Sequence, residues 1–317
     1  MGDTRIQWLA GPMLAGALSA LVFLAPAAGS ALGAVLQMAT PLPLYYIALQ
    51  KGALGAMAGL TSGFALVALV APPLSSLAVY IGIFGLPLLV GAWLYEAAGT
   101  SLREAALGRI VAGMAMALAL VMLTGALLFD RAFADQGGIL GASRNMAQSV
   151  AEAILPQDAT PEQAAQHREA FAQIAPMIPL AVAAGYFVLH VLNALAGFGL
   201  QKNREGAPRP IWSSLWLPRW LVVPALGVTA LAFVGGESGI FAGIAAAVLG
   251  VPLVLQGLAV LHVKSRNRPL RPFLLTGAYI LVFLADGARL VAAALGAADH
   301  WLDFRKQAAP PRGKENE

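Results

Sequence analysis

Residues 107–129 read LGRIVAGMAMALALVMLTGALLF, and no charged side chain follows Arg109 in this stretch. An α-helix of about 20 mainly apolar residues is long enough to cross the roughly 30 Å hydrocarbon core of a bilayer. The stretch therefore predicts a transmembrane helix. Similar apolar stretches recur along the chain, and the candidate spans cover residues 8–25, 29–49, 52–71, 74–95, 107–129, 174–200, 220–234, 239–263 and 272–298.

The composition of the whole chain agrees with a membrane protein. Of its 317 residues, 59% are hydrophobic and only 11% are charged, whereas an ordinary soluble domain has about 25% charged residues. We therefore predict an all-α fold, a polytopic transmembrane helical bundle with eight or nine spans, in which residues 1–307 form a single domain within the lipid bilayer. A net charge of +4 fits basic cytoplasmic loops, and no nucleic-acid partner is expected. Cysteine is absent, which excludes disulfides and thiolate metal sites.

Charge on the connections predicts the orientation, because Lys and Arg gather on short cytoplasmic loops. The connections 96–109, 201–219 and 264–271 are basic and fall on one side, whereas 130–173 is acidic and falls opposite. The N-terminus is then cytoplasmic, and the segment at about 130–173 is an extracytoplasmic helical insertion. The basic connections carry Arg103, Arg109, Lys202, Arg204, Arg209, Arg219, Lys264, Arg266, Arg268 and Arg271.

The C-terminal part of the chain leaves two alternatives open. A single last span would place Arg305 and Lys306 outside, against the charge rule. If the segment instead breaks near Asp286 and Gly287 into two half-helices, the tail returns to the cytoplasm. Residues 308–317, rich in Pro and charge, are expected to be a disordered tail.

Two local patterns predict helix boundaries and close helix packing. Thr160 and Gln163, with Pro161 between them, form a capping box with proline at the first helical position, so a helix begins there. We expect that helix to kink near Pro176 and Pro179. Gly55, Gly59 and Gly63 repeat every four residues and leave a smooth face that another helix can approach.

The second span carries the most distinctive polar run. Two prolines one residue apart cannot lie in an unbroken helix, because each lacks an amide proton, so we predict an interrupted span. Non-helical backbone inside a membrane is tolerated where it is buried in protein or lines a wet cavity. The run is either a ligand site or a structural kink, and its candidate residues are Gln37, Thr40, Pro41, Pro43 and Tyr45.

Polar residues also share one face of the sixth span, where Tyr186, His190 and Asn193 follow helical spacing. Polar side chains within a membrane are costly and usually face the interior of the bundle. Two interpretations stay open, hydrogen bonding between helices and a ligand or proton site. No second histidine or carboxylate lies nearby in sequence, so no metal is expected.

The last span adds a charged pair and a tyrosine. Asp286 and Arg289 are three residues apart and can pair on one helix face. Tyr279 lies two turns earlier on the same side. The pair either locks two helices together or binds an ionic ligand.

Motifs of soluble enzymes are absent from the sequence. We find no GxxxxGK[ST], no GxSxG and no HExxH, which are the signatures of phosphate-binding loops, nucleophile elbows and zinc proteases. We therefore expect neither an enzyme nor a cofactor.

Two short segments resemble the uncharacterised YybS-type family of predicted bacterial membrane proteins. They are TPLPL at 40–44 and DHWLDFRK at 299–306. The resemblance implies bacterial inner-membrane placement and a distant similarity to the S components of energy-coupling-factor transporters, which bind a metabolite and depend on separate ATPase subunits. By its residues alone, the second segment is also typical of an interfacial anchor, because aromatic and basic groups lie together.

These observations favour a solute-binding or transport-related subunit without its own ATPase. Its partners would be a small-molecule ligand and a protein partner in the membrane. The alternative is a non-catalytic membrane scaffold that recruits envelope proteins through the acidic 130–173 connection or the basic tail.

Overall fold

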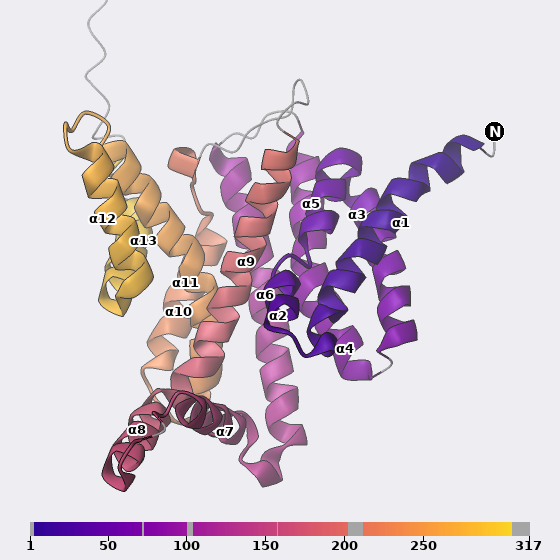
Figure 1. The fold of residues 1–317 in the computed structure, drawn as a ribbon. Coiled ribbons are helices and arrows are strands. Elements are labelled where there is room, and N and C mark those ends of the chain that lie inside the picture. The colour runs from indigo at the N-terminus through magenta and orange to yellow at the C-terminus, as the bar shows by residue number, and fades with distance from the viewer. Residues whose placement is uncertain (1–2, 72, 100–103, 157, 202–211, 306–317) are drawn as a thin grey trace, which may run out of the picture.

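The computed structural model describes residues 3–71, 73–99, 104–156, 158–201 and 212–305. Helices connected by short turns make up these ranges, and no strand is found in them (Figure 1). The predicted all-α fold is confirmed. The predicted tail at 308–317, and the cations Arg103, Lys202, Arg204, Arg209 and Lys306, lie outside the described residues.

The N-terminal half contains α1 (Asp3–Leu24), η1 (Ala25–Ala28), α2 (Ala31–Gln37), α3 (Leu42–Val70), α4 (Leu74–Val79), the π-helix η2 (Tyr80–Gly85), α5 (Leu86–Ala98) and α6 (Glu104–Ala132). The C-terminal half contains η3 (Ala134–Gln136), α7 (Gly138–Ala153), α8 (Pro161–Ile174), η4 (Ala175–Met177), α9 (Ile178–Leu200), η5 (Trp212–Ser214), α10 (Arg219–Ala232), α11 (Gly236–Lys264), α12 (Arg271–Leu284) and α13 (Asp286–Leu302).

Six helical stretches of the described chain are long and apolar enough to cross a membrane, or seven if the bent pair of α12 and α13 counts as one span. The prediction of eight or nine spans is therefore not confirmed. Two features account for the difference. The helix α10 has only 14 residues, and residues 31–70 count as one helical stretch although two spans were predicted there.

Within α3 the backbone changes direction at Gly52. This residue has φ 68° and ψ −164°, a conformation outside the helical region, and φ > 0 favours glycine. The carboxylate of Glu96 accepts a hydrogen bond from the Ala53 N–H at 2.9 Å, so it caps the second half of the helix. Leu44, fifteen positions before Gly59, packs against the backbone of that glycine. The two halves of α3 therefore lie against each other.

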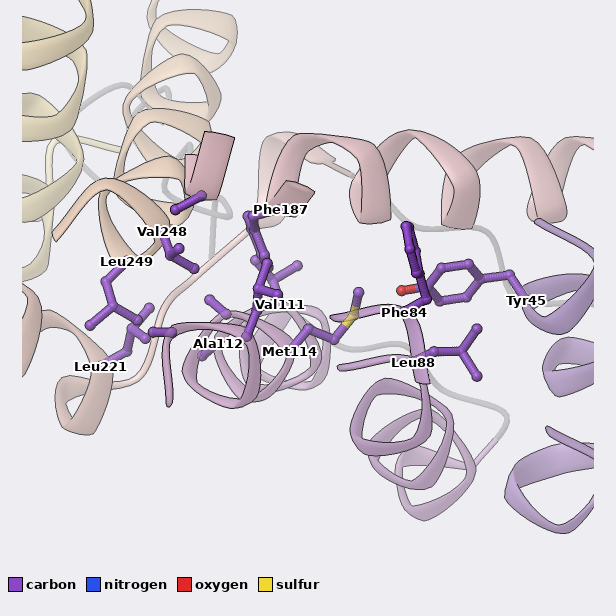
Figure 2. Packing of buried hydrophobic residues seen from close by; sticks show 14 of the residues in the cluster. Tyr45, Phe84, Leu88, Val111, Ala112, Met114, Phe187, Leu221, Val248 and Leu249 are labelled. Atoms are coloured by element: carbon purple, nitrogen blue, oxygen red, sulfur yellow. The ribbon is translucent and has the colours of Figure 1, made fainter. Parts of the chain in front are cut away.

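Helices α1 and α3 approach each other closely through glycines. A Cβ atom on Gly16 would clash with the carbonyl of Gly59, and one on Gly63 would clash with the Tyr80 hydroxyl. The smooth face predicted on the third span is therefore used for packing. Elsewhere the core is continuous: Phe187 of α9 reaches toward Val111 of α6, as Figure 2 shows.

The predicted helix start at Thr160 is confirmed in full. The Thr160 hydroxyl accepts a hydrogen bond from the Gln163 N–H, and the Gln163 side chain accepts one from the Thr160 N–H. The predicted kink is also present, because α8 ends at Ile174 and a 3-10 turn containing Pro176 precedes α9.

The ends of the helices separate into two groups (Figure 1). The starts of α1 and α12 and the ends of α5, α9, α11 and α13 lie at one end of the bundle, and α7 and α8 lie across the other. The basic connection 264–271 is thus at the same end as the N-terminus, which we call the basic end.

The last predicted span, 272–298, is broken. Helices α12 and α13 meet at Ala285 and are bent by 115°, so a single straight crossing is wrong here. Helix α12 runs inward from the basic end and α13 returns to it (Figure 1). The half-helix alternative therefore agrees with the structure.

Cysteine labelling tests this arrangement, because the natural chain has no cysteine. We expect an impermeant maleimide, applied to bacterial cells with a permeabilised outer membrane, to label Gln148→Cys on α7. Asn267→Cys and Leu302→Cys should be labelled only after the inner membrane is disrupted, because both lie at the basic end, which the charge rule predicts to be cytoplasmic. Labelling of Leu302→Cys together with Gln148→Cys would contradict the return of α13.

Candidate functional site

The predicted interruption of the second span is present between α2 and α3, where residues 38–41 form a turn. Pro41 cannot donate to the Gln37 carbonyl, and the hydroxyl and the N–H of Thr40 donate to it at 2.7 and 3.0 Å. The Thr40 carbonyl accepts from the Ser19 hydroxyl at 2.7 Å, and the Gln37 amide donates to the Phe23 carbonyl at 3.3 Å. Side chains of the turn and of α1 therefore satisfy the backbone at the break.

Helix α9 supplies the remaining partner of this turn. The Leu42 N–H bonds the Ala39 carbonyl, which leaves the Met38 carbonyl without its usual helical donor. The side-chain amide of Asn193 donates to Met38 at 2.9 Å and to Leu189 in its own helix at 2.8 Å. Asn193 thus fixes α9 against the break.

His190 likewise donates a hydrogen bond to a carbonyl of the π-helix that lacks its helical donor. Pro87 has no N–H for the carbonyl four residues earlier, that of Ile83. His190 Nε2 lies 2.7 Å from this oxygen and donates to it, because a carbonyl only accepts. In the neutral ring, Nδ1 then accepts from the Tyr45 hydroxyl at 2.8 Å. Both ring nitrogens are therefore occupied within the protein.

Little space is left around this group of side chains. His190 is fully buried and Tyr45 is 5% exposed. Tyr186 packs edge-on against Phe84, with 5.6 Å between the ring centres. The cavity beside Tyr45 has a volume of about 50 Å³ and apolar walls, which is room for a water and not for a metabolite. A ligand-binding role for Gln37, Thr40, Pro41, Pro43, Tyr45, Tyr186, His190 and Asn193 stays a prediction.

The polar residues of the last span lie elsewhere. Asp286 and Arg289 form the predicted pair, with 2.6 Å between Oδ1 and Nη2, and both side chains are at least half exposed. The Tyr279 hydroxyl is 2.8 Å from His262 Nε2. The structure therefore does not bring residues 279–289 together with His190.

Tyr279 lines a larger cavity between α9, α11 and α12, which we call the α9–α11–α12 cavity. Its volume is about 450 Å³, and its walls are mostly apolar. The lining residues are Val188, Val191, Leu192, Leu195, Trp212, Ser213, Val251, Leu255, Leu258, Ala259, His262 and Tyr279. The α9 residues in this lining lie on the helix face opposite His190.

Sequence reasoning did not identify His262, Trp212 or Ser213 as parts of one site. His262 precedes the basic connection by two residues, and its bond to Tyr279 crosses a turn between two helices. The only sequence signal was a polar residue near the end of an apolar stretch, which is common at membrane interfaces.

A buried ion pair lies near this cavity, at the segment that resembles the YybS-type family. Asp299 is fully buried, and Arg305 Nη2 is 2.7 Å from its Oδ2. Arg305 Nη1 also donates to the carbonyls of Leu215 and Ser213, at 2.8 and 3.4 Å. The interfacial anchor predicted for this segment stays a prediction, but the side chain of Arg305 is only 11% exposed and holds the stretch before α10.

Gln256 completes this arrangement from α11. Its carbonyl oxygen accepts from the Leu217 N–H at 2.8 Å, and its amide donates to the Gly296 carbonyl at 2.9 Å. A fully buried side chain thus joins α11 to α13 and to the non-helical residues 215–218.

A family model described as "Predicted membrane protein (DUF2232)" matches residues 17–300. The chain belongs to this family. No curated protein and no solved structure matches it. The match confirms a membrane protein in general terms, and the narrower resemblances to YybS-type proteins and to S components stay predictions.

The buried ion pair gives a test by mutation. Arg305→Gln leaves the buried carboxylate of Asp299 unpaired, and we expect the free energy of unfolding in detergent to fall by about 3–5 kcal/mol. The double variant Asp299→Asn/Arg305→Gln should lose less than the two single variants together. Arg289→Gln, which breaks an exposed pair, serves as the control and should cost at most about 1 kcal/mol. If the free energy lost in the double variant equals the sum of the losses in the two single variants, the energetic coupling between Asp299 and Arg305 is contradicted.

Proposed function

We propose that this protein is a non-catalytic, solute-binding subunit of the bacterial inner membrane, related to transport and without its own ATPase. Its ligand would occupy the α9–α11–α12 cavity. One observation carries the proposal: a cavity of about 450 Å³ with apolar walls and a single hydrogen-bonded pair, His262 and Tyr279. Small-molecule sites have volumes of roughly 300–1,000 Å³ and this same pattern of lining.

The polar pair can orient a ligand. His262 Nε2 is bonded to the Tyr279 hydroxyl, and no hydrogen-bond partner of His262 Nδ1 is found among the described residues. That nitrogen can bind a donor or an acceptor of the ligand, depending on the tautomer. The rest of the lining supports apolar contact.

Helix α12, which forms one wall of the cavity, packs loosely against the rest of the protein, and this supports entry of a ligand there. Helix α12 has no buried residue, and its main packing partner in the structure is α13. Elements with few buried contacts open at low free-energy cost. The 115° bend at Ala285 gives α12 a hinge of its own.

The energy source for transport would be a partner or an ion gradient, because the sequence has no phosphate-binding loop. The resemblance to S components supports a partner with ATPase activity. The scaffold alternative has one observation in its favour, the position of α7 and α8 across the far end of the bundle (Figure 1).

Native mass spectrometry of the detergent-purified protein tests the proposed function. We expect a bound small molecule on the wild type, and its loss in Leu255→Trp, because the indole projects into the cavity and narrows it. Leu69→Trp is the matched control, since Leu69 is 81% exposed, and it should keep the ligand.

Two results would contradict the proposed function. An adduct that persists in Leu255→Trp would place the ligand elsewhere. A wild type without any adduct, with a protein partner that is lost when residues 138–174 are deleted, would support the scaffold.

A further inference from the structure

At the basic end of the bundle, the connection 264–271 next to the α9–α11–α12 cavity carries an excess of positive charge. We propose that the ligand of this cavity is an anionic phospholipid, with its acyl chain between α9, α11 and α12 and its phosphate against Arg266 and Arg271. This inference rests on the proposed function, because it names the chemical class of the same ligand.

The walls of the cavity suit an acyl chain. Val188 and Leu192 line the cavity from α9, and they are 41% and 59% exposed. Tyr279, on the α12 side, is 48% exposed. The cavity therefore opens sideways toward the hydrocarbon, and a lipid chain can enter without passing a polar barrier.

The cations at the mouth are close to this apolar space. Arg266 Nη2 lies 3.4 Å from the hydroxyl of Ser213, which is itself a lining residue. Arg271 begins α12, the helix that carries the lining residue Tyr279. One guanidinium group thus contacts a residue of the cavity wall, and the other starts the helix that supplies Tyr279.

Within the described residues, these cations have no carboxylate partner. The ion pairs found in the described part of the chain join Arg168 to Glu152, Arg289 to Asp286 and Arg305 to Asp299, and none involves residues 264–271. Among the described residues, the buried Nε of Arg271 has no hydrogen-bond partner, which costs free energy. A phosphate can pair with the guanidinium groups of both arginines, because guanidinium and phosphate groups form charge-assisted, often bidentate bonds.

An amphiphile fits the two parts of the site better than a soluble anion. A small anion would bind the arginines and leave about 450 Å³ of apolar space unfilled, and water does not fill such space favourably. Basic pockets between transmembrane helices are known binding sites for anionic lipid headgroups. Trp212 at the mouth adds an aromatic group at the level where headgroups lie.

The test uses the full-length protein in nanodiscs and two synthetic lipids with identical acyl chains, phosphatidylglycerol and phosphatidylcholine. Native mass spectrometry after release from the nanodisc measures which lipid stays bound. We expect wild type to retain phosphatidylglycerol preferentially. Arg266→Gln/Arg271→Gln should weaken this retention roughly 30-fold, since each cation near the surface contributes to the binding of anionic lipid.

A charge-matched control separates site binding from general attraction. Arg131→Gln/Arg144→Gln removes the same two charges at the α7–α8 end, where both side chains are exposed, and should leave retention unchanged. Leu255→Trp should lower retention of both lipids, because the indole projects into the space for the acyl chain.

Two results would overturn the inference, and they differ in what they leave standing. In the first, Leu255→Trp lowers retention of both lipids equally and the arginine variant has no effect. The cavity then binds a ligand whatever the charge of its headgroup, and the proposed function still holds. If Leu255→Trp changes nothing, neither the lipid nor the cavity as a binding site is supported.

Discussion

The structure depends on one constraint: a backbone carbonyl that loses its helical N–H inside a membrane needs another donor, because no water is there to supply one. Pro87 removes the donor for Ile83, and the turn at Pro41 frees Met38. His190 and Asn193, both on α9, donate to these two oxygens. The position of α9 relative to the broken helices follows from these two bonds.

The same requirement explains the second polar group of the protein. Residues 215–218 are not helical, although Leu215 and Leu217 are fully buried. Arg305 donates to the Leu215 carbonyl, and Gln256 accepts from the Leu217 N–H. Because Arg305 is also paired with Asp299, the end of α13 fixes the stretch that carries Ser213 to the mouth of the α9–α11–α12 cavity.

Local features of the fold could be predicted from the sequence, and long-range pairings could not. The apolar stretches, the break at Pro41 and the capping box at Thr160 depend on neighbouring residues. The bond between Tyr45 and His190 joins positions 145 apart, and nothing in either local pattern specifies it. The burial of Arg305 was missed for the same reason, since an arginine beside aromatic residues is equally typical of an interfacial anchor. The predicted number of spans is not confirmed where α10 is short and α3 changes direction at Gly52.

The measurement that tests the central claim most directly is the free energy of unfolding of His190→Leu and Asn193→Leu in detergent. Each variant leaves a buried carbonyl without its donor, so we expect each to lose about 1–3 kcal/mol. Tyr186→Phe is the control on the same helix, because its hydroxyl has no hydrogen bond to the residues that the structure describes, and it should change little. Unfolding free energies for His190→Leu and Asn193→Leu that equal the control would contradict the claim that these two side chains hold the broken helices in place.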